Sequence, residues 1–133
     1  MTDNKLSRFR GKLHDSTQQK SIEVNLDLIE YQEADLYYAY SPALDLVGYG
    51  ITPIEARQSW EIVLQEYITY TLNKNTLRKD LQSRGWAVKK GSKQFRPPTI
   101  SWLLQNNKEL ANVYDKHNFK KSSTQVLMPV AYA

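Results

Sequence analysis

Hydrophobic and polar residues alternate strictly along the segment SIEVNLDLIEY, which begins at Ser21. Alternation with a period of two is typical of a β-strand that buries one face and leaves the other in water. We therefore predict a strand over residues 22–30. Its buried face would carry Ile22, Val24, Leu26 and Leu28, and its solvated face Glu23, Asn25 and Asp27.

A second run of β-favouring residues, LYYAY, follows after a short polar segment. The short separation predicts an antiparallel hairpin whose second strand spans residues 36–41. Pro42 lacks a backbone N–H and should end this strand or lie at a sheet edge. One face of the strand would carry Leu36, Tyr38 and Tyr40, and the other Tyr37 and Ala39.

The chain then returns to an extended pattern, DLVGYGI, which predicts a third strand near residues 47–51. Gly48 and Gly50 permit a bulge or the close approach of another backbone at this strand.

The residues that follow carry a helix-start signal. Thr52 can cap the helix, Pro53 takes the first helical position, where no donor is needed, and Glu55 completes a capping box. Helical spacing of apolar residues predicts a helix over residues 53–70 that packs against the three strands. Its apolar stripe contains Ala56, Trp60, Val63, Leu64, Tyr67, Ile68 and Leu72.

The remainder of the chain has a weaker pattern. It predicts a short helix ending at Gly85, a strand near residues 86–89, a basic loop with two prolines, and a helix over residues 99–119. Alternation near the end predicts a final strand, in which Pro129 requires an edge or terminal place.

These elements predict an α+β fold: a three-stranded antiparallel sheet packed by one long capped helix, with a C-terminal helical and strand extension. The predicted divisions are an N-terminal tail or loose strand (1–20), a β-β-β-α core (21–73), and an extension made of a basic helix, loop, helix and terminal strand (74–133).

Composition places the chain among ordinary globular domains. It has 133 residues, of which 41% are hydrophobic and 24% charged, and it has no cysteine. Disulfides and thiolate metal sites are therefore excluded. No apolar run resembles a secretory signal or a membrane span, so we expect a cytoplasmic protein without membrane contact.

Charge is divided into blocks along the chain. Residues 21–73 contain one basic and nine acidic residues, whereas residues 74–96 contain eight basic residues and one acidic residue. The blocks could neutralise each other in the fold, or each could face a partner of opposite sign. The candidate partner-facing acidic residues are Glu23, Asp27, Glu33, Asp35 and Asp45. The candidate nucleic-acid contacts are Arg84, Lys89, Lys90, Lys93 and Arg96.

Residue types that carry catalysis are sparse. The two histidines, His14 and His117, stand in unrelated contexts, where a solvated side chain is the simpler interpretation. The chain contains no phosphate-binding loop, dinucleotide-binding glycine motif or zinc-protease motif. We therefore predict no enzyme and assign no catalytic, cofactor-binding or metal-ligating residue.

The basic segment 74–96 interleaves Trp86 and Phe95 with its cations, a pattern that fits nucleic-acid binding. The loop GSKQFRPP interrupts the chain where a recognition helix should follow. Only weak, non-specific binding is therefore expected.

Two segments, VNLDLIEY and DLYYAYSPALDLVGYGITPIEARQSWEIVLQEYI, together resemble the HicB-like antitoxin family over roughly residues 22–70. The order of an aromatic strand, a Pro-x-Leu segment, a glycine turn and a Thr-x-x-Glu-Ala helix start carries the resemblance. The chain has Ile51 where the family often has an acidic residue, and no DNA-binding module of the family is recognisable after Asn73.

The resemblance implies a degenerate ribonuclease-H-like domain that binds a protein and does not cleave nucleic acid. In such bacterial toxin–antitoxin pairs it masks a small basic, HicA-like toxin that cleaves messenger RNA. The acidic segment 21–73 suits that partner. The alternatives are a nucleic-acid-binding protein that uses residues 74–96, and a HicB-like domain with an unrelated partner or with itself.

Overall fold

The computed structural model describes residues 21–88 and 95–129. It confirms an α+β fold, and none of the helices in these two ranges is long and apolar enough to cross a membrane. In chain order the elements are β1 (Ser21–Glu33), β2 (Leu36–Ser41), β3 (Leu46–Gly50), α2 (Pro53–Asn73), α3 (Leu77–Ser83), β4 (Ala87–Val88), β5 (Phe95–Arg96), α4 (Ile100–Asn106), α5 (Lys108–Lys116) and β6 (Phe119–Pro129).

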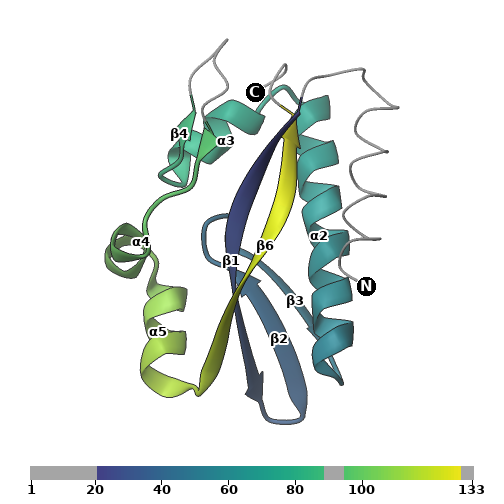
Figure 1. The fold of residues 1–133 in the computed structure, drawn as a ribbon, viewed down its shortest axis with the longest axis vertical. Helices are drawn as coiled ribbons and strands as arrows, with labels where there is room; N and C mark the ends of the chain where they lie inside the picture. Colours follow the sequence, from purple (N-terminus) through teal and green to yellow (C-terminus); the bar gives the residue numbers. More distant parts are fainter. Residues whose placement is uncertain (1–20, 89–94, 130–133) are drawn as a thin grey trace.

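The main sheet has four strands in the order β3-β2-β1-β6, and every neighbouring pair is antiparallel. The prediction of three strands was therefore wrong. β6 pairs with β1 from Ser21 opposite Pro129 to Tyr31 opposite Phe119, so the fourth strand comes from the predicted extension. Figure 1 shows α2 along one side of the sheet, and α4 and α5 on the other.

The predicted alternation along β1 is confirmed on the side that faces α2, where Val24, Leu26 and Leu28 are buried. The sequence suggested that the opposite side of β1 is solvated, and this is wrong for part of the strand. Ile29 lies there fully buried in a second cluster, which includes residues of α4 and α5. Helices that come much later in the chain cover this part of the sheet, so the local pattern could not indicate them.

The predicted start of α2 is confirmed at Thr52, whose Oγ1 accepts the Glu55 N–H at 3.1 Å. The Glu55 carboxylate turns back as expected, but it accepts the N–H of Ile51, at 3.2 Å. The helix continues to Asn73, three residues beyond the predicted end. It closes where Asn75 adopts a left-handed φ of 57°, a common helix ending.

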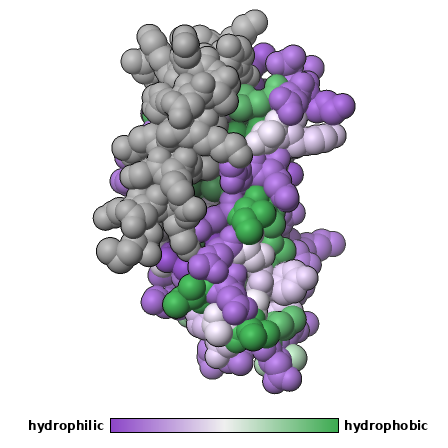
Figure 2. Space-filling view, turned by 90° about the vertical axis from the view of Figure 1, so that its right-hand side faces the viewer, coloured by the Kyte–Doolittle hydropathy of each residue, from purple (hydrophilic) through white to green (hydrophobic). Residues whose placement is uncertain are grey.

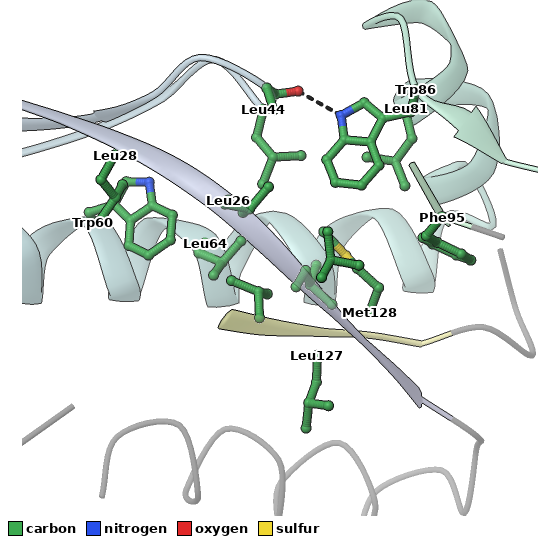
Figure 3. Packing of buried hydrophobic residues seen from close by; sticks show 14 of the residues in the cluster. Leu26, Leu28, Leu44, Trp60, Leu64, Leu81, Trp86, Phe95, Leu127 and Met128 are labelled. Atoms are coloured by element: carbon green, nitrogen blue, oxygen red, sulfur yellow. Dashed lines mark hydrogen bonds between the residues drawn. The ribbon is translucent and has the colours of Figure 1, made fainter. Parts of the chain in front are cut away.

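Two buried tryptophans join α2 and α3 to the sheet and to the turn that follows β2 (Figure 3). Trp60 is 2% exposed, and its indole N–H donates to Ser41 Oγ at 2.8 Å. The Trp86 indole N–H donates to the Ala43 carbonyl oxygen at 2.7 Å. Both polar groups are therefore satisfied inside an apolar core, which favours a single packing arrangement.

The predicted end of the short helix is also confirmed. Gly85 has a φ of 90°, and the Trp86 N–H donates to the Leu81 carbonyl oxygen, as in a glycine-terminated helix. A Cβ at Gly85 would also lie 2.6 Å from the Trp102 ring of α4. The strand predicted near residues 86–89 is shorter: β4 pairs Val88 with Phe95 of β5.

The single helix predicted over residues 99–119 is two helices, α4 and α5, and its last residue begins β6. The break lies at Asn107, which has extended backbone angles. Its side-chain oxygen accepts the N–H groups of Glu109 and Leu110, at 3.0 and 3.2 Å. Asparagine is a strong helix-capping residue, so it starts a new helix where apolar spacing alone suggests continuation.

Candidate functional site

The five residues of β3 divide between two environments. Gly48 and Gly50 face α2 so closely that an added Cβ at Gly48 would lie 2.1 Å from the Trp60 backbone nitrogen. The close approach predicted for these glycines is therefore confirmed. Val47 and Tyr49 point to the other side of the sheet and are 43% and 61% exposed. One short strand thus fixes the helix and presents an apolar surface.

Three tyrosines lie opposite one another across three strands, and we call them the tyrosine row: Tyr31 on β1, Tyr38 on β2 and Tyr49 on β3. The rings of Tyr31 and Tyr38 are stacked, with centroids 5.1 Å apart and planes 13° apart. The rings of Tyr38 and Tyr49 are 6.4 Å apart and tilted by 38°. Cross-strand aromatic pairs of this kind stabilise a sheet and can form a flat recognition surface.

The two ends of the row differ. His117, which follows α5, stacks on Tyr31 with ring centroids 4.9 Å apart and closes that end. Tyr49 stands at the other end on β3, the edge strand of the sheet. Ile51, just past β3, is 68% exposed. The row is therefore covered at its β1 end and accessible at its β3 end.

Carboxylates act on two tyrosines on this side of the sheet. Burial raises the pKa of Tyr31, and the negative charges of Glu33 and Glu109 raise it further. Burial also raises the pKa of Tyr40, and its hydrogen bond to Asp45 adds to that shift. The carboxylates of Glu33, Glu109 and Asp45 therefore act on tyrosines of this side of the sheet.

A polar connection joins this side of the sheet to the break between α4 and α5. The Tyr40 hydroxyl donates to Asp45 Oδ1 at 2.6 Å, and the Asn107 side-chain N–H donates to the Tyr40 oxygen at 2.7 Å. Asn107 therefore caps α5 with its oxygen and holds β2 with its nitrogen. The connection positions the two helices over Ile29 and leaves the β3 end of the row uncovered.

The predicted acidic residues do not form one cluster. Alternation along β1 places Glu23, Asp27 and Glu33 on the side away from α2, but the first and last are about 33 Å apart along an extended strand. Asp27 lies 4.0 Å from the Lys121 nitrogen. Glu33 and Asp35 are exposed at one end of β2, and Asp45 is exposed in the turn at its other end.

The residues predicted to contact nucleic acid lie in different surroundings. Lys89, Lys90 and Lys93 lie outside the described residues, as does His14. Arg96 is exposed on β5. Arg84 is engaged within the fold: its Nε donates to Asp80 Oδ2 at 2.8 Å, and its guanidinium lies 5.7 Å from the Tyr67 ring centroid.

Sequence reasoning missed the tyrosine row. The run of tyrosines in β2 was visible, but alignment with Tyr31 and Tyr49 depends on the register of three strands. His117 was interpreted as a solvated side chain, whereas it packs on Tyr31. The outward alternation of Val47, Tyr49 and Ile51 was the one local signal that could have indicated an exposed apolar strand.

The side of the molecule on which α2 lies also carries exposed apolar residues. Figure 2 views this side, and its coloured part shows hydrophobic residues as separate patches among hydrophilic ones. Ile54, Ile62 and Tyr70 are exposed on α2 and follow one another at eight-residue intervals, about 12 Å apart along the helix axis. Isolated apolar residues are normal on protein surfaces, so they indicate no binding site.

A scan against protein-family models, a search of curated proteins and a search of solved structures found no match to this chain. Within residues 21–88 and 95–129, no three histidine, aspartate or glutamate side chains gather as a metal-binding group. The tyrosine row with its carboxylate surroundings is therefore the candidate site.

Proposed function

We propose that this chain is a protein-interaction domain that binds a basic protein through the tyrosine row, and that it acts by binding and not by catalysis. One observation carries the proposal: stacked tyrosines reach an edge strand, and carboxylates act on tyrosines of the same side of the sheet. Aromatic residues are enriched in protein interfaces, and charge complementarity selects the partner.

The resemblance to the HicB-like family makes the partner more specific. β1, β2, β3 and α2 follow one another in the order that the resemblance implies. A small basic, HicA-like toxin that cleaves messenger RNA would bring positive charge to the acidic side of the sheet. We propose such a cytoplasmic toxin as the partner, with this chain as the antitoxin that masks it.

Selection of short peptides from a random display library, with the full chain as the target, tests the general proposal. We expect peptides with net positive charge and apolar residues to be enriched. Replacing Tyr38 and Tyr49 together by alanine should weaken their binding about tenfold or more. Ile62→Ala, on the outer side of α2, is the matched control and should leave binding unchanged.

Circular dichroism would first establish that each variant is folded. Enrichment of acidic or neutral peptides would contradict the proposal. So would peptides that bind the double variant as well as the original chain, because the tyrosine row would then not be the contact surface.

Nucleic-acid binding by residues 74–96 is the second candidate function, and exposed Lys79 and Arg96 favour it. Arg84 is already paired with Asp80, which leaves fewer cations for phosphate. We expect at most non-specific binding, with a Kd no tighter than about 10⁻⁶ M at physiological salt. A gel shift that shows a nanomolar, sequence-dependent complex would favour this second function over the first.

A further inference from the structure

The tyrosine row lacks a neighbour at one end. Tyr31 has a ring on each side, because Tyr38 and His117 stack at 5.1 and 4.9 Å. Tyr49 has Tyr38 on one side only, at 6.4 Å, and is 61% exposed. Among the residues that the structure describes, no further ring and no cation lies against Tyr49.

Two other tyrosines of this chain each hold a cation. Lys74 lies 5.9 Å from the ring centroid of Tyr70, and Arg84 lies 5.7 Å from that of Tyr67. Asp80 adds a negative charge to the second pair, with its carboxylate 2.8 Å from the Arg84 nitrogen. A tyrosine ring together with a carboxylate is thus a cation-binding arrangement that this fold already uses.

The segment that contains Tyr49 carries acidic residues and no cation. Asp35 and Asp45 are exposed at the two ends of β2, the strand that pairs with β3. Residues 36–56, which include both strands and the start of α2, contain no lysine or arginine. A cation that stacks on Tyr49 would therefore come from outside this segment.

The backbone of β3 restricts how a partner can approach. The Tyr49 N–H donates to Ser59 Oγ of α2 at 3.2 Å, so this donor is not free to pair with an added strand. An added strand could therefore not pair with this donor, whereas the Tyr49 ring remains accessible for contact. A second copy of the chain would bring the same carboxylates to the interface, and like charges would oppose it.

We infer that the partner presents an arginine whose guanidinium stacks on the uncovered ring face of Tyr49 and lengthens the tyrosine row by one planar group. Arginine fits better than lysine, because its guanidinium is planar and more weakly hydrated. This inference rests on the proposed function, since it names the chemical group by which the same surface recognises its basic partner.

Synthetic peptides that alternate valine with arginine, lysine or citrulline provide the test, titrated into the full chain and followed by nuclear magnetic resonance. Citrulline keeps the planar shape of arginine without its charge. We expect the arginine peptide to bind about two- to fivefold more tightly than the lysine peptide, and the citrulline peptide to bind most weakly. The arginine δ-methylene protons should shift upfield, because they lie over an aromatic ring.

Variants at Tyr49 separate stacking from apolar contact. Tyr49→Phe keeps the ring and should retain the preference for arginine and the upfield shift. Tyr49→Leu keeps apolar area without a ring and should lose both. Because Tyr49 is exposed, neither change should unfold the chain.

Three results would overturn the inference. Equal binding of the arginine and lysine peptides at this surface, without the upfield shift, would refute the arginine contact and leave the proposed function standing. No binding of any peptide at the tyrosine row would refute both. A dimer of the chain alone that Tyr49→Leu dissociates in analytical ultracentrifugation would assign the surface to a second copy.

Discussion

The two sides of the four-stranded sheet are covered in different ways. On one side α2, a single helix of 21 residues, contacts the backbone of β3 directly. This contact is possible because Gly48 and Gly50 place no side chain between the strand and the helix. On the other side, two helices of seven and nine residues cover Ile29 through side chains and leave Tyr49 accessible.

The difference separates stability from recognition within one strand. On the inward side of β3, Gly48 permits no side chain, since a Cβ there would lie 2.1 Å from the helix backbone. Outward positions carry Val47 and Tyr49, which contribute little burial and remain accessible. A change at an inward position should therefore lower stability, and a change at an outward position should lower binding.

The largest expected effect is on the α2 side. Trp60→Ala should lower the free energy of unfolding by about 3 to 5 kcal/mol, because it removes a ring that is 2% exposed and leaves Ser41 Oγ without its donor. Trp102→Ala on α4, where the ring is 39% exposed, should cost clearly less. Urea unfolding measures both, and equal losses would show that the two sides do not differ.

Gly48→Ala should cost about 3 kcal/mol, because the new methyl group would force α2 away from β3. Val47→Ala is the matched control on the same strand and should cost less than about 1 kcal/mol. If Gly48→Ala proved as mild as its control, the close contact between strand and helix would be wrong.

On the other side, Tyr40→Phe should cost about 1 to 2 kcal/mol, since it removes the hydroxyl that joins Asp45 to Asn107. Hydrogen exchange should show faster opening of α5 and little change in α2. Equal acceleration in both helices would contradict a local role for this connection.

The same substitution has a pH signature. Burial and the Asp45 hydrogen bond raise the pKa of Tyr40 above its ordinary value of 10.0, so the folded chain holds this proton more tightly than the unfolded chain. The resulting stability is fully present below pH 10.0 and decreases as the pH rises through the folded-state pKa. Tyr40→Phe should make the loss of stability at high pH smaller. The loss that remains should come from Tyr67, whose pKa is also raised.

The smallest expected effect lies where β3 passes into α2. Thr52→Ala removes the oxygen that accepts the Glu55 N–H and should cost about 1 kcal/mol. Thr52→Ser keeps the oxygen and should be nearly neutral. Thermal unfolding of the two variants checks this, and identical melting temperatures would mean that the cap contributes nothing.

Features that depend on neighbouring residues were predictable. The cap at Thr52 and the helix end at Gly85 follow from side-chain and backbone chemistry within a few positions. The alternation of β1 identified the residues that face α2. Distant partners were not predictable: the polar start of β6 pairs with β1 across some ninety residues, as the hydrogen bond between Ser122 and Glu30 illustrates.

Of the candidate site, the sequence predicted only that its charge would be negative. Acidic residues 21–73 indicated a basic partner, yet Glu23 and Asp35 lie near opposite ends of the long β1 strand. The surface itself depends on strand register, which aligns Tyr31, Tyr38 and Tyr49. A shift of one residue in any pair would turn one of these rings to the α2 side.

The amino-acid sequence by itself therefore determined where α2 begins, how α3 ends and which β1 residues face α2, because caps, glycines and alternation act over a few residues. Only the tertiary structure decided which strands are neighbours, where the helix over residues 99–119 divides, and which tyrosines stack. The Tyr40 hydroxyl favours the helix break at Asn107 from 67 positions away, and such a contact exists only once the chain has folded.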